Sequence, residues 1–293
     1  MLLLAVAAPL RRSAPPLEST TDAVNERELL IPQVAHASFK AWPALNSEET
    51  RFAVNAGRRH RLHLDEPTRE LFRSDTLLGR FGLALAERKA VDRKEWFEAC
   101  EFFSQVRGKL KAGISEESSG GGEATLVDMA GGHGLVGALG AIFKSRDFDR
   151  VLVIDQRKPR AFDAVLSAAV EVAPWVDGRL EYQQRRVGPR EPLPHRSAVA
   201  CVHGCRGLTD KIIAAAAAAE ARTVALMPCC YPSNAANAPA ALQNALGVPL
   251  AADVQRTYDL EAAGYTVRWR AVPPSITPMN RILLASRAAG RGL

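Results

Sequence analysis

The feature that most constrains the fold is an alternation of β-type runs and helical stretches after residue 124. The first five β-type runs span residues 125–130, 151–156, 179–187, 197–204 and 223–230. Parallel strands need long crossover connections, usually helices, so the alternation predicts a parallel sheet covered by helices. Two last runs, 264–272 and 280–287, are joined only by the Pro-rich link PPSITPM and should pair antiparallel. We therefore expect an α/β, Rossmann-like fold with a seven-stranded, mostly parallel sheet that ends in an antiparallel strand pair.

The sequence before this sheet divides into three segments. Residues 1–24 are interpreted as a disordered or targeting extension, and residues 25–115 as a helical accessory domain. The clearest helix is predicted at 93–111, because apolar residues recur there at steps of three and four. Its expected buried stripe comprises Trp96, Cys100, Phe103, Val106 and Leu110. Residues 116–124 are rich in Gly and Ser and predict a linker, which leaves residues 125–293 as the sheet domain.

Composition and charge limit the partners that this chain can have. Hydrophobic residues make up 47% and charged residues 24%, and no apolar run approaches the roughly 18 residues of a membrane helix. We expect a soluble body with no membrane partner. The net charge of +6 permits an anionic partner such as RNA, although scattered arginines produce the same value without one. A basic cluster either contacts phosphates or forms a solvated face. It consists of Arg58, Arg59, His60, Arg61 and His63.

Five cysteines and the N-terminal residues bear on the cellular compartment. The number is odd and four of the five fall in two tight groups, which differs from a disulfide framework and indicates a reducing compartment. The N-terminus has a short apolar run followed by Arg11 and Arg12, with no acid before Glu18. This pattern resembles a weak plastid or mitochondrial transit sequence. We therefore expect a cytoplasmic or organellar protein, and the oligomeric state is left open.

A glycine turn and a strand-end acid predict a nucleotide-type cofactor. The first β-type run leads directly into Gly131, Gly132, His133 and Gly134, where the lack of side chains lets the backbone approach a ligand closely. Asp155 ends the next run. A carboxylate at that position accepts hydrogen bonds from the two ribose hydroxyls of an adenosine. The ordered pair indicates a cofactor that contains adenosine.

The glycine spacing alone does not choose between two cofactors. Gly132, Gly134 and Gly137 satisfy G-x-G-x-x-G, the dinucleotide fingerprint, so an NAD(P)-dependent oxidoreductase is one alternative. Asp128 favours S-adenosylmethionine, because a carboxylate before the glycines attracts the methionine ammonium and repels a pyrophosphate. The antiparallel strand pair at the C-terminus and the long helical segment ahead of the glycine turn also favour a methyltransferase. A non-catalytic cofactor-binding module is the remaining alternative.

Four segments resemble motifs of a known superfamily. DMAGGHG resembles motif I and VLVIDQ motif II of class I S-adenosylmethionine-dependent methyltransferases. CVHGCRGLTD and ALMPCCYP resemble a branch with an LHAC…TD segment followed by PCC, which is similar to tRNA 2′-O-ribose methyltransferases. The resemblance implies S-adenosyl-L-methionine as cofactor, and its expected contacts are Asp128, Ala130, Gly131, Gly132, His133, Gly134, Asp155, Gln156, Gln184, Arg185 and His203. Two departures stand out, since Ala130 replaces the first glycine of motif I, and Gln184 or Arg185 stands where many relatives have an acid against the adenine.

The histidine and cysteines of the last two motifs permit three interpretations. Period-two alternation predicts that Cys201, His203 and Cys205 share one face of a strand, and Cys229 and Cys230 end the next strand. The residues serve packing and helix capping only, or they line the methyl-transfer pocket, or they bind a metal. Their spacing matches no zinc signature, so no metal is predicted.

In the catalytic interpretation, His203 is the general base and a cysteine is the alternative nucleophile. Cys229 could attack C6 of a pyrimidine, with Cys230 beside it. We predict that His203 and one of these two cysteines stand at the mouth of the pocket. The methyl acceptor is left open among RNA (tRNA or rRNA), a small molecule and a protein side chain, with RNA favoured by the positive charge and the resemblance.

Overall fold

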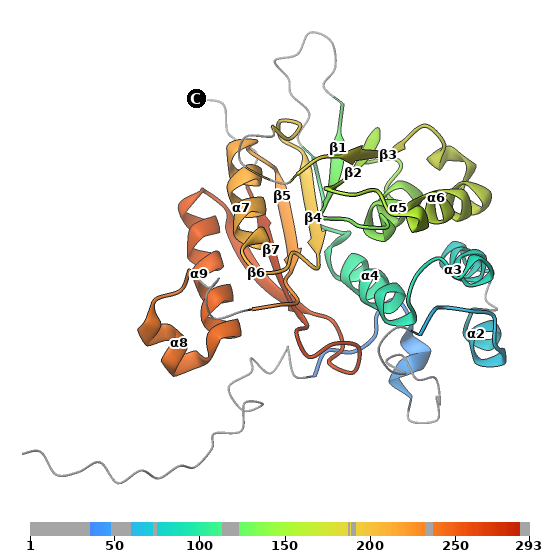
Figure 1. The fold of residues 1–293 in the computed structure, drawn as a ribbon, viewed down its shortest axis with the longest axis horizontal. Helices are drawn as coiled ribbons and strands as arrows, with labels where there is room; N and C mark the ends of the chain where they lie inside the picture. Colours follow the sequence, from blue (N-terminus) through green and yellow to red (C-terminus); the bar gives the residue numbers. More distant parts are fainter. Residues whose placement is uncertain are drawn as a thin grey trace, which may run out of the picture.

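Seven strands form one sheet at the centre of the molecule (Figure 1). The computed structural model describes residues 36–47, 60–72, 75–112, 123–186, 188, 192–231 and 237–287. The strands are β1 (Thr125–Met129), β2 (Arg150–Asp155), β3 (Leu180–Gln184), β4 (Ala198–Val202), β5 (Thr223–Met227), β6 (Thr266–Ala271) and β7 (Arg281–Ser286). All seven coincide with the β-type runs of the sequence.

The strand order is β3-β2-β1-β4-β5-β7-β6. Strands β1 to β5 pair in parallel, whereas β7 pairs antiparallel with both β5 and β6. The predicted Rossmann-like sheet with its antiparallel pair is therefore confirmed. The chain crosses back after β3 to place β4 beside β1, so the strand order reverses between these two strands. In open α/β sheets, ligands bind outside the carboxyl ends of the strands at such a reversal.

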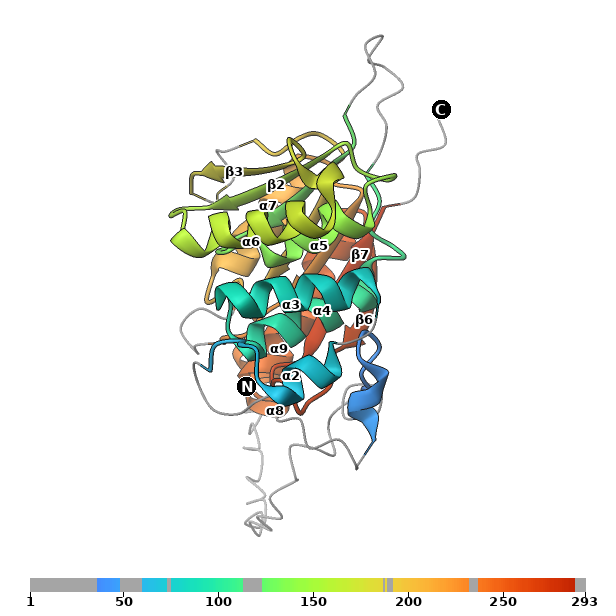
Figure 2. The same ribbon diagram turned by 90° about the vertical axis from the view of Figure 1, so that its right-hand side faces the viewer.

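Helices cover both faces of the sheet. They are η1 (Pro43–Asn46), α2 (Glu66–Leu71), α3 (Leu77–Arg88), α4 (Arg93–Val106), α5 (Leu135–Phe143), α6 (Arg160–Val172), η2 (Pro174–Val176), α7 (Leu208–Ala218), α8 (Ala240–Leu246) and α9 (Val248–Ala262). The helices from α3 to α6 lie on one side of the sheet and those from α7 to α9 on the other (Figure 1). Figure 2 faces the first of these layers. The sequence patterns did not anticipate α8 and α9.

The N-terminal helices share a hydrophobic core with the sheet. Trp96 of α4 packs edge-on against Phe72 and Phe81, and one continuous apolar cluster extends from these rings to Leu126 of β1 and Phe162 of α6. In the part of the chain described, residues 36–112 therefore form a layer on the sheet. Most of the predicted linker, and the whole extension at residues 1–24, lie outside the described residues.

Helix α4 begins at a capping box and ends sooner than its apolar stripe suggests. The Asp92 side chain accepts from the backbone N–H of Glu95, while the Glu95 side chain accepts from the backbone N–H of Asp92. The predicted end at Lys111 is wrong, because the helix stops at Val106, just before Gly108, a residue that weakens helices. Leu110 is nevertheless fully buried. No helix among the described residues is both long enough and apolar enough to cross a bilayer.

Candidate functional site

The turn after β1 is held in left-handed backbone conformations. Ala130, Gly132 and Gly134 have φ values of 54°, 52° and 73°. A Cβ atom on Gly131 would lie 2.7 Å from the carboxyl carbon of Asp128, closer than side-chain atoms approach. At Gly132, by contrast, an added Cβ would meet nothing within 4 Å. The turn therefore wraps closely around Asp128 and leaves open space at Gly132.

Asp128 is a buried carboxyl group beneath the glycine turn. It is 1% exposed, and its Oδ2 accepts a hydrogen bond of 2.8 Å from the backbone N–H of Gly137 in α5. Burial raises the pKa of Asp128 to about 7, because one backbone hydrogen bond offsets only part of the lost hydration. A cationic group placed beside this carboxyl would favour its ionised form.

Asp155 connects the end of β2 to the same turn. Its Oδ2 accepts from the backbone N–H of Gly132 at 3.0 Å, and its Oδ1 accepts from the N–H of Gln156 at 2.6 Å. On the neighbouring strand β3, Gln184 is in register with Asp155, and the Arg185 N–H donates to the Asp155 carbonyl at 2.9 Å. The acid and its neighbours thus form a polar edge beyond the glycine turn.

Two glutamates of α4 each hold a histidine at the carboxyl edge of the sheet. Glu95 Oε2 lies 3.2 Å from His133 Nε2 in the glycine turn, and Glu98 Oε2 lies 3.2 Å from His203 Nε2 after β4. Residues three apart on a helix lie on one face, so both acids point the same way. Sequence reasoning missed both, although acids inside the apolar periodicity of a helix are a signal for buried charge.

These contacts shift the pKa values of Glu95, Glu98 and His203. Burial opposes ionisation of Glu95, but the hydrogen bond and charge of His133 outweigh it and lower the Glu95 pKa to about 2. Burial acts against Glu98 too, yet His203 lowers its pKa. For His203, burial favours the neutral ring, but the hydrogen bond and charge of Glu98 prevail and raise the pKa. The contact between Glu98 and His203 therefore favours the charged forms of both groups.

A cavity of about 250 Å³ lies where these elements meet. Its lining comprises Glu95, Ala99, Asp128, Ala130, Gly131, Gly132, His133, Leu135, Val136, Val202 and His203. Six of the residues expected to contact a cofactor are thus together on one cavity. Gly134 instead caps α5, and Asp155, Gln156, Gln184 and Arg185 are outside this lining, at the neighbouring ends of β2 and β3.

Residues 98–236 match the family model described as a methyltransferase domain. This part of the chain is therefore similar to methyltransferase domains. The match includes the glycine turn, all of the cavity lining except Glu95 and the two later motifs, and it confirms the resemblance stated from the motifs. No curated protein matches the chain in sequence.

Solved structures share parts of the fold at low identity. The 23S rRNA methyltransferase ErmE is 14% identical, with a TM-score of 0.37 over 68% of this chain and 69% of that chain. The tRNA methyltransferase TrmK of B. subtilis is 12% identical, with a TM-score of 0.35 over 58% and 62%. Fibrillarin, a pre-rRNA processing protein of Methanococcus jannaschii, is 12% identical, with a TM-score of 0.35 over 57% and 67%.

The cysteines of the methyltransferase domain do not line the cavity. The prediction that Cys201, His203 and Cys205 share one face is wrong. Cys201 is buried in the cluster against α7, whereas His203 reaches α4 on the opposite face. The strand ends at Val202, and the left-handed His203, with φ of 71°, breaks the alternation.

Cys205 instead approaches the end of β5. Its sulfur lies 2.9 Å from that of Cys229 and 3.5 Å from that of Cys230. The hydrogen bond from Cys229 lowers the pKa of Cys205 to about 6, against the effect of burial, and the pKa of Cys229 is raised in return.

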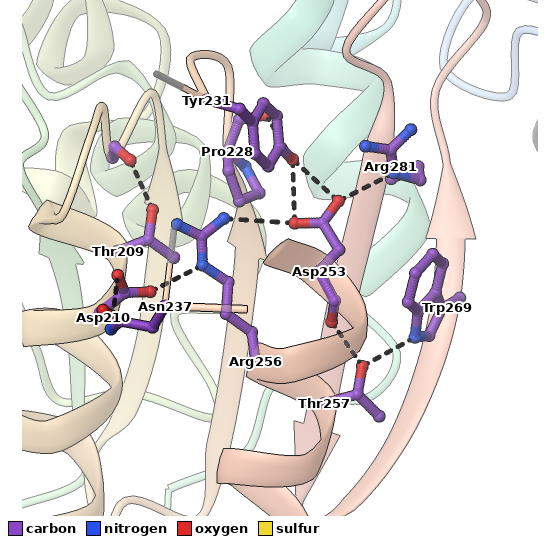
Figure 3. A network of polar contacts seen from close by, with 11 residues as sticks. Thr209, Asp210, Pro228, Tyr231, Asn237, Asp253, Arg256, Thr257, Trp269 and Arg281 are labelled. Atoms are coloured by element: carbon purple, nitrogen blue, oxygen red, sulfur yellow. Dashed lines mark hydrogen bonds and ion pairs between the residues drawn. The ribbon is translucent and has the colours of Figure 1, made fainter. Parts of the chain in front are cut away.

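Asp210 of the TD segment and Tyr231 of the PCCY segment belong to one polar network (Figure 3). Thr209 donates to the Gly204 carbonyl, which closes the turn before α7. Asp253 of α9 is fully buried and accepts from Tyr231 Oη at 2.8 Å and from Arg281 Nε at 2.8 Å. Arg256 then joins Asp253 to Asp210, with Nε 2.8 Å from the Asp210 carboxylate. Through these contacts Asp210, Tyr231 and Arg281 are all held to α9.

Two residues of the basic cluster before α2 pair with acids of the same chain. Arg61 pairs with Asp92 at 3.4 Å and His63 with Asp65 at 3.2 Å. Arg58 and Arg59 lie outside the described residues, and so does Pro232 at the end of the ALMPCCYP motif.

Exposed cations are present at another place in the domain. Arg157, Arg186 and Arg206 are exposed and follow β2, β3 and β4 respectively. Because these strands are parallel, their carboxyl ends meet at one edge of the sheet, which is the edge that holds the cavity.

Proposed function

We propose that the domain transfers the methyl group of S-adenosylmethionine to RNA. The observation that carries this proposal is the cavity at the reversal of strand order, where Asp128, the open position at Gly132 and the Glu98–His203 pair converge. A catalytic site needs a place for the electrophile and a positioned base close to it. This cavity offers both within one set of lining residues.

The residues present fit S-adenosylmethionine. Asp128 is an acid in an apolar surrounding and suits the cationic ammonium of the methionine part. His133 adds a buried ring nitrogen, Nδ1, that has no hydrogen-bond partner among the described residues and borders the same cavity. Asp155 would accept from the ribose hydroxyls, with Gln156 beside it and Gln184 or Arg185 toward the adenine. When bound, the cofactor supplies an electrophilic methyl group on a sulfonium.

His203 is the base in this proposal and Glu98 is its positioning residue. In the neutral ring of the proposed base, the N–H lies on Nε2 toward Glu98 and Nδ1 keeps a lone pair. Nδ1 can therefore take the proton that the acceptor hydroxyl or amine loses. The Glu98 carboxylate, whose side chain is 1% exposed, stabilises the imidazolium that results and fixes the ring orientation. A catalytic role for Cys229 or Cys230 stays a prediction. These cysteines contact Cys205, and neither is among the residues that line the cavity.

An RNA acceptor is supported by the charge around the cavity. The chain has a net charge of +6, and Arg157, Arg186 and Arg206 stand exposed after the strands whose ends form the cavity edge. Arginine guanidinium groups bind phosphates, and a row of them would follow a polyanion across this edge. The exposed rim is a better candidate for phosphate contacts than Arg61, which is paired with Asp92.

Calorimetry with S-adenosylmethionine, S-adenosylhomocysteine and NAD tests the cofactor. We expect binding of the first two and none of NAD. The Asp155→Ala variant should bind S-adenosylmethionine about 10- to 100-fold more weakly, because a charge-assisted acceptor of about 1.5 to 3 kcal/mol is lost. Asp163→Ala, which changes an acid on nearby α6 paired with Lys158, is the matched control. Binding of NAD alone would identify an oxidoreductase, and binding without any transfer a non-catalytic module.

A labelled-methyl assay on total RNA, total protein and a metabolite extract tests the acceptor. Label should enter RNA. RNA binding should weaken steeply as the salt concentration rises. The triple variant with Arg157, Arg186 and Arg206 replaced by Ala should reduce the slope of log K against log salt concentration by at most about three units. Label in protein or metabolites, with none in RNA, would remove RNA as the acceptor and leave the cofactor assignment standing.

A further inference from the structure

Three thiols from two neighbouring strand ends converge beside the candidate active site. Strand β4 ends at Val202 and β5 at Met227, and these two residues are in register in the parallel pair. The loop after β4 contributes Cys205, and Cys229 and Cys230 follow β5 directly. The Sγ–Sγ distances are 2.9 Å, 3.5 Å and 3.6 Å, so the three sulfurs form a compact triangle.

The loop before α7 is bent so that Cys205 faces the end of β5. His203 and Arg206, on either side of it, have φ values of 71° and 59°. Residues with side chains rarely adopt this left-handed conformation. Thr209 secures the bend through its hydrogen bond to the Gly204 carbonyl. On the other side, Tyr231 is anchored to buried Asp253, which fixes the chain immediately after Cys230.

The triangle has the size and the chemistry of a metal site. Zinc bound by thiolates lies about 2.3 Å from each sulfur in a tetrahedral arrangement, which separates the sulfurs by about 3.8 Å. The observed edges are shorter, by less than about 1 Å, so small side-chain rotations would admit the ion. Thiolate sulfur selects soft ions such as Zn²⁺ over Mg²⁺ or Ca²⁺. We propose that Cys205, Cys229 and Cys230 together bind one zinc ion.

Its fourth coordination position is open to an outside ligand. The cluster contains no fourth His, Cys, Asp or Glu among the residues that the structure describes. Cys230 is exposed, so water reaches the site and completes the tetrahedron. Because Cys205 stands two residues after His203, the ion would clamp the ends of β4 and β5 next to the proposed base. The site does not depend on the identity of the methyl donor or acceptor.

A disulfide between Cys205 and Cys229 is the competing arrangement. Their sulfurs lie 2.9 Å apart, well beyond the roughly 2.05 Å of an S–S bond. A disulfide would also leave Cys230 without a role, although its sulfur is within 3.6 Å of both others. The near-equal separations of all three thiols favour a shared ligand.

The experiment measures zinc in the full chain purified under reducing conditions without chelator. Elemental analysis should find one zinc per chain, and replacement by Co²⁺ should give the thiolate-to-cobalt charge-transfer absorption of a cysteine-bound tetrahedral ion. Cys205→Ser and Cys229→Ser should each weaken zinc binding by more than about tenfold in competition with a chromophoric chelator. Cys100→Ala, a buried cysteine outside the cluster, should keep one zinc.

Circular dichroism shows whether each variant is folded before its zinc is counted. The wild-type result decides independently of the variants. Wild-type protein that contains no zinc and takes up neither Zn²⁺ nor Co²⁺ overturns the proposal. So does a mass loss of two hydrogens in freshly purified protein with Cys205 linked to Cys229. Equal zinc in the Cys205→Ser variant would place the ion elsewhere and would equally defeat this assignment.

Discussion

Glu98 Oε2 lies 3.2 Å from His203 Nε2, which joins the N-terminal helical layer directly to the loop after β4. The contact crosses from α4 to the carboxyl edge of the sheet, where His203 lines the cavity. A carboxylate fixed behind an imidazole both orients the ring and raises its proton affinity. The helical layer thus contributes side chains to the candidate site as well as to the core.

Glu98→Gln should move the pH dependence of methyl transfer toward lower pH. In the wild type, the pKa of His203 is raised above its ordinary 6.5, so the neutral base appears only as the pH rises through that higher value. Glutamine removes the charge of Glu98, while burial and the neighbouring Lys94 still favour the neutral ring. We expect the acidic limb of kcat/KM to shift downward and its plateau to fall by up to about 100-fold. Glu95→Gln is the comparison, and an unmoved limb in Glu98→Gln would exclude His203 as the titrating base.

Asp128→Asn should stabilise the ligand-free protein at alkaline pH and weaken cofactor binding. The folded pKa of Asp128 is raised from 3.8 to about 7, so its contribution to stability is complete below pH 3.8 and is lost as the pH rises through 7. Asparagine keeps an acceptor for the Gly137 N–H without ionising. The unfolding free energy of the variant minus that of the wild type, measured in urea, should be about 2 to 4 kcal/mol larger at pH 8 than at pH 4. A difference that stays constant over this range contradicts the raised pKa.

Gly132→Val should abolish S-adenosylmethionine binding at a modest cost in stability. Its φ is 52° and an added Cβ meets nothing within 4 Å, so the branched side chain would extend into the cavity. Gly178→Val is the matched control, because Gly178 has φ of 71° and equally open surroundings in the turn before β3. Both variants should lose about 1 to 2 kcal/mol of folding stability, because valine is strained in the left-handed backbone conformation. Calorimetry should find binding lost only at Gly132, and equal affinities would move the cofactor away from this turn.

Asp253→Ala should destabilise the fold strongly. Its carboxylate is fully buried and is the shared partner of Tyr231, Arg256 and Arg281, so its removal leaves two buried guanidinium groups without it. Breaking a buried charge network in this way costs about 3 to 5 kcal/mol. Asp259→Ala on the exposed side of α9 should change the unfolding free energy by less than about 0.5 kcal/mol. Similar values for the two variants would show that the network is dispensable.

Local sequence patterns were sufficient for the strands and for the glycine turn. Five β-type runs separated by helical sequence permit a parallel sheet, and the short link PPSITPM forces the last two strands to be antiparallel. Gly132 and Asp155, both expected to contact the cofactor, lie next to each other in the fold, because the ends of adjacent parallel strands meet at one edge. Period-two alternation failed at His203, where a left-handed residue ends the regular strand geometry.

The sequence by itself determined the sheet, the glycine turn and the edge of the sheet at which the cavity lies, because each of these depends on local periodicity and strand order. Only the tertiary structure decided which partners the site residues have. Glu98 reaches His203, and Cys205 reaches Cys229, between segments far apart in the chain. Such pairings arise from how helices and loops dock across a common core, and docking depends on side-chain shape and charge at many positions at once. No single periodicity in the sequence records them.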